Sequence, residues 1–149
     1  MTPLFSKLNL KDQGAIFVLG APESFEPELE ALQGVAVKRQ IGKGDRIAFG
    51  LGFAITQQQL DEVSAALAAA AEGDAVVWVA YPKGSSKRYR CEFNRDSGWT
   101  VLGQAGFEPV RQVAIDEDWS ALRFRRVEFI KSLTRAPQRR LTRASGAPG

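Results

Sequence analysis

One segment of this 149-residue chain collects side chains that bind anions. It reads Lys83-Gly84-Ser85-Ser86-Lys87-Arg88 and follows an apolar run that ends at Tyr81-Pro82. Ammonium and guanidinium groups pair with phosphate or carboxylate, hydroxyls add hydrogen bonds, and a glycine lets the backbone approach the ligand. The spacing Gly-x-x-x-x-Gly-Lys-Ser/Thr is absent, so this is not a P-loop. The predicted anion-binding residues are Lys83, Ser85, Ser86, Lys87 and Arg88. The alternative interpretation is a solvated basic loop.

The composition excludes several kinds of chemistry. The chain contains no histidine and one cysteine, Cys91. A Ser-His-Asp or Cys-His pair therefore cannot be built, and zinc sites of four cysteines or of two cysteines and two histidines are excluded. A disulfide within the chain is excluded as well. We predict no catalytic residues, no cofactor and no metal, and the sequence leaves open whether the protein is an enzyme.

The sequence predicts a cytoplasmic protein without a membrane partner. The first seven residues lack the apolar region and cleavage site of a signal peptide. No run approaches the roughly 18 apolar residues that cross a bilayer. A single unpaired cysteine also agrees with a reducing compartment.

The positive charge is concentrated at the C-terminal end. Residues 131–149 carry five Lys/Arg and no acid, whereas residues 1–130 have a net charge of −2. We therefore expect one domain over residues 1–130 and a disordered basic tail over residues 131–149, because the tail has few large apolar side chains. The tail and the basic segment 83–95 provide an alternative function, a weak, salt-dependent contact with nucleic acid.

Strand and helix patterns alternate along the first 130 residues. The clearest helix runs from Thr56 to Glu72, where Thr56 and Gln59 form a capping box and Gly73 fits the position after the helix. Further helices are expected from Phe25 to Gly34 and from Asp96 to Ala105. Strands are expected at 15–19, 35–41, 46–53, 75–80, 110–115 and 119–127. This order predicts an α/β sandwich with a mostly parallel sheet and helices on both faces.

Two short connections break the alternation. The three-residue acidic turn Asp116-Glu117-Asp118 predicts that the last two strands form an antiparallel hairpin. The turn Gly42–Asp45 favours either an antiparallel pairing of its flanking strands or a shift of strand 46–53 across the sheet edge. The acidic turn either keeps the hairpin soluble, binds a hard cation, or pairs with Arg88, Arg90 or Arg123 to fix the basic loop.

Two other candidate features have structural alternatives. Cys91 follows three cationic residues, which would lower the pKa of its thiol, although a buried structural cysteine is the default interpretation. Trp99 and Trp119 could stack on a ring, whereas core packing is the alternative.

Two motifs stand in the C-terminal half of the domain, Trp78-x-x-x-Pro82-Lys83 at a strand end and Asp116-x-x-Trp119-Ser120-x-Leu122-x-Phe124 in the hairpin. On these motifs the chain resembles a family of small bacterial α/β proteins of unknown function. The resemblance covers most of residues 4–126 and implies no activity.

The order of elements is also similar to a truncated, Rossmann-like S-adenosylmethionine-dependent methyltransferase fold, which ends in an antiparallel hairpin. In that family the first strand leads into a glycine-rich turn beside the cofactor. Here the turn reads Leu19-Gly20-Ala21-Pro22, with one glycine and a proline that removes an amide. The leading hypothesis is therefore a non-catalytic module that binds a small anion or phosphorylated metabolite. A degenerate methyltransferase-like domain is the other alternative.

Overall fold

The computed structural model describes residues 2–130, so the predicted tail 131–149 lies outside the described residues. Six strands form one sheet in the order β2-β1-β3-β4-β6-β5. The first four strands of this order are parallel to one another, and β6 is antiparallel to both β4 and β5. This arrangement confirms the predicted α/β class, including the final hairpin. The strands are β1 (Ala15–Leu19), β2 (Ala36–Lys38), β3 (Ile47–Phe53), β4 (Ala71–Pro82), β5 (Phe107–Ala114) and β6 (Trp119–Arg126).

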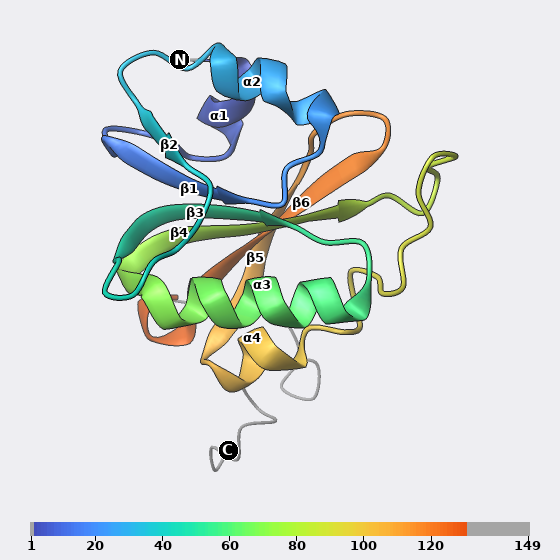
Figure 1. The fold of residues 1–149 in the computed structure, drawn as a ribbon. Helices are drawn as coiled ribbons and strands as arrows, with labels where there is room; N and C mark the ends of the chain where they lie inside the picture. The colour runs from blue at the N-terminus through green and yellow to red at the C-terminus, as the bar shows by residue number, and fades with distance from the viewer. Residues whose placement is uncertain (1, 131–149) are drawn as a thin grey trace.

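Helices cover both faces of the sheet, which completes a three-layer sandwich (Figure 1). On one face lie α1 (Pro3–Lys7), the 3-10 turn η1 (Glu23–Phe25) and α2 (Glu26–Glu30); on the other lie α3 (Gln57–Ala70) and α4 (Thr100–Gln104). A last 3-10 turn, η2, spans Val127–Phe129. The indole Nε1 of Trp78 donates to the carbonyl oxygen of Leu8 at 2.7 Å, which ties the centre of the sheet to the chain after α1. None of the described helices is long and apolar enough to cross a membrane.

Helix α3 packs unusually close to strand β3. Its N-terminus has the predicted capping box, because Thr56 accepts from the backbone of Gln59 while the Gln59 side chain accepts from the backbone of Thr56. A Cβ atom placed on Gly52 would lie 2.2 Å from Val63 Cγ1, and one on Gly50 would lie 2.7 Å from a Leu67 methyl. The two glycines therefore allow the helix to approach, and the helix N-terminus comes to lie beside the end of β3.

Strand β3 shows which alternative applies to the Gly42–Asp45 turn. It does not pair with β2 but lies on the other side of β1, parallel to it. Phe17 of β1 pairs with Lys38, the last residue of β2, and with Gly50 in the middle of β3. Measured along the strand direction, Ile47 at the start of β3 therefore lies only about 10 Å back from Lys38. The eight residues 39–46 span up to about 26 Å, enough to pass under β1 without a helix. The antiparallel alternative is wrong.

Several element boundaries differ from the prediction: α2 and β2 are shorter than expected, and β4 and β5 begin earlier. Two of the differences have a clear cause. Helix α3 ends at Ala70 and the chain enters β4 at once, because Ala71 already lies opposite Ile47. Gly73 has the expected positive φ of 58°, but within an irregular start of β4 rather than after a helix. Helix α4 begins only at Thr100, because Asn94 Oδ1 accepts from Asp96 N and holds the preceding residues in a turn.

Candidate functional site

The parallel strands bring three chain turns to one edge of the sheet. β1, β3 and β4 end there at Leu19, Phe53 and Pro82, and this carboxyl edge is where open α/β sheets bind ligands. A cavity of about 830 Å³ follows the end of β4, and we call it the loop cavity. A smaller cavity of about 330 Å³ lies between the ends of β1 and β3, and we call it the switch-point crevice.

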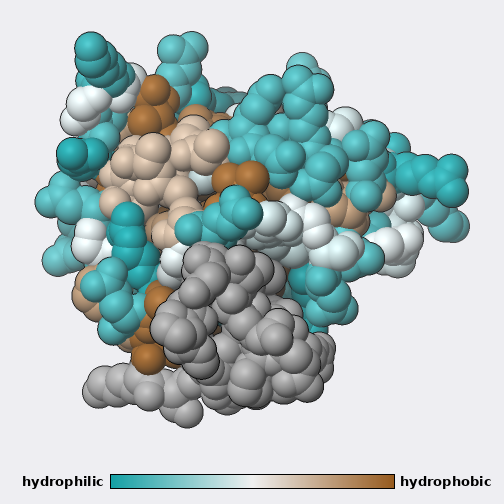
Figure 2. Space-filling view, turned by 90° about the horizontal axis from the view of Figure 1, so that it is seen from below, coloured by the Kyte–Doolittle hydropathy of each residue, from teal (hydrophilic) through white to brown (hydrophobic). Residues whose placement is uncertain are grey.

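Cationic side chains dominate the wall of the loop cavity. One carboxylate, Glu92, also lines it, but its Oε1 accepts from the backbone N–H of Gln57 at the start of α3. Within residues 2–130 the ion pairs are Arg39–Glu26 and Arg125–Asp74, so none of the cavity cations is held in a salt bridge there. The projecting loop that carries most of them is mainly hydrophilic (Figure 2, right). The cations of the cavity are Lys83, Lys87, Arg88, Arg90 and Arg95.

The structure places four of the five predicted anion-binding residues at this cavity. These are Lys83, Ser86, Lys87 and Arg88. Ser85 instead lines a neighbouring cavity of about 650 Å³, where Lys87 and Arg88 face the acidic turn 116–118. The predicted anion-binding residues 83–88 therefore line two neighbouring cavities and do not surround a single site.

Ser86 fixes the shape of the loop. Its hydroxyl donates to Asp118 Oδ1 at 2.8 Å and accepts from the backbone N–H groups of Arg88 and Tyr89. The backbone N–H of Lys83 donates to the carbonyl oxygen of Asp118, which adds a second tie to the hairpin. The acidic turn thus holds the loop through a serine, and the predicted pairing with Arg88 or another arginine is wrong.

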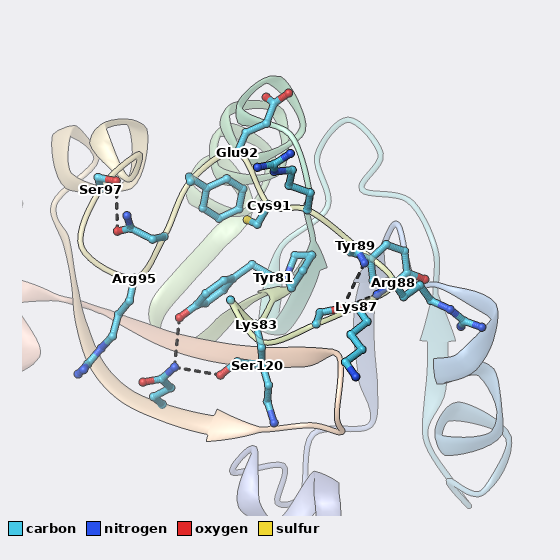
Figure 3. A pocket seen from close by; sticks show the side chains of 17 residues that line it. Tyr81, Lys83, Lys87, Arg88, Tyr89, Cys91, Glu92, Arg95, Ser97 and Ser120 are labelled. Atoms are coloured by element: carbon cyan, nitrogen blue, oxygen red, sulfur yellow. Dashed lines mark hydrogen bonds between the residues drawn. The ribbon is translucent and has the colours of Figure 1, made fainter.

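The polar floor of the loop cavity could not be recognised from any motif. Gln112 Nε2 donates to Tyr81 Oη at 3.2 Å and to Ser120 Oγ at 3.0 Å (Figure 3). These residues come from β5, β4 and β6, and they meet because β6 lies between the other two strands. The signal that could have located them is the register of β4 against β6, which sets Tyr81 opposite Ser120.

Burial governs the protonation of two groups in the cavity wall. It raises the pKa of the Tyr81 phenol, against a smaller lowering by Arg95. Burial also raises the pKa of the Cys91 thiol, against a smaller lowering by the backbone N–H of Phe93. The predicted lowering of the Cys91 pKa by neighbouring cations is therefore wrong, and the default interpretation of Cys91 as a packed side chain agrees with the structure.

Aromatic rings form part of the wall of the switch-point crevice, where Phe53, Tyr89 and Trp119 line it. The Phe53 ring lies 4.9 Å from that of Phe25 and 5.2 Å from that of Trp119. Trp119 in turn contacts the ring of Tyr89 at 5.1 Å. Tyr89 lines both cavities, so one ring forms the partition between them. Trp99 and Trp119 are both buried in the core, which agrees with the packing alternative.

The acidic turn offers no cluster for a cation among the described residues. No group of three or more His, Cys, Asp or Glu side chains in residues 2–130 is placed to hold a metal ion. Asp116 Oδ1 accepts from the backbone N–H groups of Asp118 and Trp119, which accounts for its position in the hairpin turn.

Comparison with solved structures identifies the fold. The chain matches the crystal structure of the N-methyltransferase NodS from Bradyrhizobium japonicum WM9 with 10% identity and a TM-score of 0.53, over 83% of this chain and 92% of that chain. The complex of NodS with S-adenosyl-L-homocysteine matches with 9% identity and a TM-score of 0.47, over 76% and 78%. The pyocyanin biosynthetic protein PhzM matches with 12% identity and a TM-score of 0.47, over 80% and 52%.

No protein-family model matches the chain, and no curated protein sequence matches it either. The resemblance to a bacterial family of unknown function therefore stays a prediction. At 10% identity the likeness to NodS is a likeness of fold. The chain has a Rossmann-like fold similar to that of a methyltransferase.

Proposed function

We propose that this chain is a degenerate methyltransferase-like domain that binds a small anionic molecule in the loop cavity. In this proposal the switch-point crevice, where the fold would hold S-adenosylmethionine, no longer serves a cofactor. The turns at the crevice fit a cofactor poorly, and the cations beside it make no ion pair within residues 2–130.

The turns around the crevice do not fit an adenosyl cofactor. Gly20, with φ 70°, is the one glycine of the first turn, and Pro22 has no N–H to donate to a ligand. Rossmann-type sites place an acid near the end of the second strand to bind ribose hydroxyls. Here that strand ends at Lys38 and is followed by Arg39, which pairs with Glu26 at 2.6 Å.

The rings in the crevice also oppose cofactor binding. Phe53 and Trp119, which line the crevice, are at most 4% exposed, so they are packed as core and leave a cavity of only about 330 Å³. Displacing them would expose apolar area that each ring now buries, at a cost of about 25 cal/mol for each Å². The residues present therefore do not fit S-adenosylmethionine, and we derive no methyl-transfer step.

The observation that carries the proposal is the set of five cations around the loop cavity. None of them is held in an ion pair within the described residues, and the loop that displays them is tied down by Ser86 and Asp118. A fixed loop presents its charges without a large ordering cost at the moment of binding. A volume of about 830 Å³ is in the range of small-molecule sites.

A thermal-shift screen against phosphate, pyrophosphate and phosphorylated metabolites tests the anion site. A compound present at 100 times its Kd stabilises the fold by about 2.7 kcal/mol, which raises the Tm by several degrees. We expect Lys83→Ala/Lys87→Ala to abolish that rise. The matched control Lys11→Ala/Lys43→Ala removes the same charge from exposed positions away from the cavity and should keep it. An unchanged shift in the cavity variant would exclude this site.

Isothermal titration tests the crevice separately. We expect no heat of binding with S-adenosylmethionine or with S-adenosylhomocysteine, because the first turn has one glycine, Pro22 has no N–H to donate, and the crevice is small. Saturable binding of either compound, weakened by a substitution of Gly20, would show that the crevice is still a cofactor site. The nucleic-acid alternative, which uses the basic tail together with segment 83–95, stays a prediction, since the tail lies outside the described residues.

A further inference from the structure

The loop cavity is too large for a single oxyanion. Its volume of about 830 Å³ is near the upper end of the range found for drug-sized ligands. A phosphate bound by one or two cations would occupy a small part of that space. A ligand that uses the whole cavity must therefore contact groups at some distance from the loop.

The polar floor provides such groups. Tyr81 Oη and Ser120 Oγ each accept a hydrogen bond from Gln112. Both hydroxyls keep their own hydrogen, so even if one donates to the other, a donor remains for a ligand. Both residues are at most 5% exposed, which makes an unmatched donor costly and a bound acceptor favourable.

Two of the cations, Arg95 and Lys83, flank this floor, and the loop cations Lys87 and Arg88 form what we call the rim. The charge of Arg95 lowers the pKa of the Tyr81 phenol, against the larger effect of burial. In Figure 3 Arg95 lies on one side of Tyr81, the Lys83 ammonium lies past Ser120, and Arg88 extends away at the far side of the loop. The cavity therefore has Arg95 on one side of its polar floor and the cations of the loop on the other.

We infer that the ligand is a small organic molecule with an oxyanion group at each end. One group is bound at the rim by Lys87 and Arg88, and the other at the floor by the hydroxyls of Tyr81 and Ser120 between Arg95 and Lys83. The floor group is a carboxylate or a phosphate, since donors outnumber acceptors there. This inference rests on the proposed anion site and specifies its ligand class.

A length series of two-ended probes tests this inference. The probes are phosphonoacetate, 3-phosphonopropionate and 4-phosphonobutyrate, each paired with the alkylphosphonate of equal length that has a methyl group in place of the carboxylate. Affinities are measured by isothermal titration at constant ionic strength, because cationic sites respond to salt. For at least one pair we expect the carboxylate to tighten binding by about tenfold or more, the usual effect of a charge-assisted hydrogen bond.

Variants assign that difference to the floor. Tyr81→Phe/Ser120→Ala should reduce the preference for the carboxylate to within about threefold, while the phenyl ring of that variant can keep the ring contacts with Phe93 and Trp99. Lys87→Ala/Arg88→Ala should weaken both members of a pair alike. Ser97→Ala, which removes a hydroxyl of the same cavity away from the floor, is the matched control and should keep the preference.

The outcomes separate this inference from the proposed function. If the wild type binds the alkylphosphonates as tightly as their carboxylate partners, the second oxyanion site is wrong and the anion site stands. The same conclusion follows if the floor variant keeps the full preference. If no phosphonate binds and the thermal-shift screen also finds no anion, both proposals are wrong.

Discussion

The switch-point crevice and the loop cavity lie at the same edge of one sheet, and their walls are opposite in character. The crevice wall includes the rings of Phe53, Trp119 and Tyr89, in which Trp119 contacts both of the others, and none of the described cationic side chains lines it. The loop cavity is lined by cations that make no ion pair within residues 2–130. Tyr89 belongs to both walls.

This difference indicates that the crevice stabilises the carboxyl edge of the sheet and that the loop cavity offers a surface for a ligand there. Ring packing in the crevice holds Trp119 at the start of β6 and Tyr89 in the loop, so it fixes the frame of the loop cavity. Apolar packing is stable without a ligand, whereas like charges held near one another repel until an anion binds. The crevice therefore accounts for stability at this edge, and the loop cavity offers a binding surface.

The largest effect on stability should come from removing an aromatic ring from the wall of the crevice. Phe53→Ala removes a ring that is 4% exposed, and we expect it to lower the free energy of unfolding by about 3–5 kcal/mol in urea titrations. Lys87→Ala, in the wall of the other cavity, should change it by about 0.5 kcal/mol or less, because the side chain is exposed. Equal losses of unfolding free energy in the two variants would contradict the claim that the crevice, and not the loop cavity, stabilises this edge.

The next effect concerns the helix that borders the crevice. In Gly52→Ala the new methyl group would meet Val63 Cγ1 at 2.2 Å, and a β-branched side chain has little freedom to move. We expect a loss of about 1–3 kcal/mol in the free energy of unfolding. Gly84→Ala, in the basic loop, has no atom within 4 Å of its Cβ and should be close to neutral. A neutral Gly52→Ala would show that α3 shifts without cost.

Much of the fold could be predicted from local patterns. The continuous apolar runs at 15–19 and 75–80 are central strands, and the Thr56–Gln59 capping box starts α3 as expected. The place of β3 could not be deduced, because it depends on how far an extended connection reaches and not on its composition. The end of α3 also escaped prediction, since the pairing of Ala71 with Ile47 outweighs the helical propensity of alanine.

The site was predictable only where it is continuous in sequence. The loop stands out because its cations are neighbours along the chain, whereas Tyr81, Gln112 and Ser120 meet only through strand order. The role of Ser86 was misjudged for the same reason. A hydroxyl in a basic loop resembles a ligand contact until Asp118, 32 residues away, is found within 2.8 Å.

A smaller effect should come from loosening the loop itself. Ser86→Ala removes the bond to Asp118 and the acceptor for two backbone N–H groups, at a cost of about 1 kcal/mol. We expect faster cleavage of the native protein by trypsin after the lysines and arginines of residues 83–90, because proteases select mobile exposed loops. Ser85→Ala is the matched control and should be cut at the wild-type rate. Equal rates for the two variants would show that Asp118 does not hold the loop.

The smallest effect is on the reactivity of Cys91, and it tests whether burial or the nearby cations set the pKa of this thiol. Cations near Cys91 would lower the pKa of its thiol, but burial raises it, and the carboxylate of Glu92 raises it further. With a raised pKa, less thiolate is present at neutral pH, so iodoacetamide should alkylate native Cys91 more slowly than an ordinary thiol with a pKa of about 8.5.

The same chain in urea is the reference for Cys91, because unfolding removes burial and leaves the sequence neighbours in place. Across a pH series, the alkylation rate of the native protein should reach half its maximum at a higher pH than that of the unfolded chain. The opposite order would mean that the positive field of the loop outweighs dehydration at Cys91. The loop cations would then stabilise an anion at the half-buried position of Cys91 more than burial disfavours it, as the proposed binding of an anionic ligand requires.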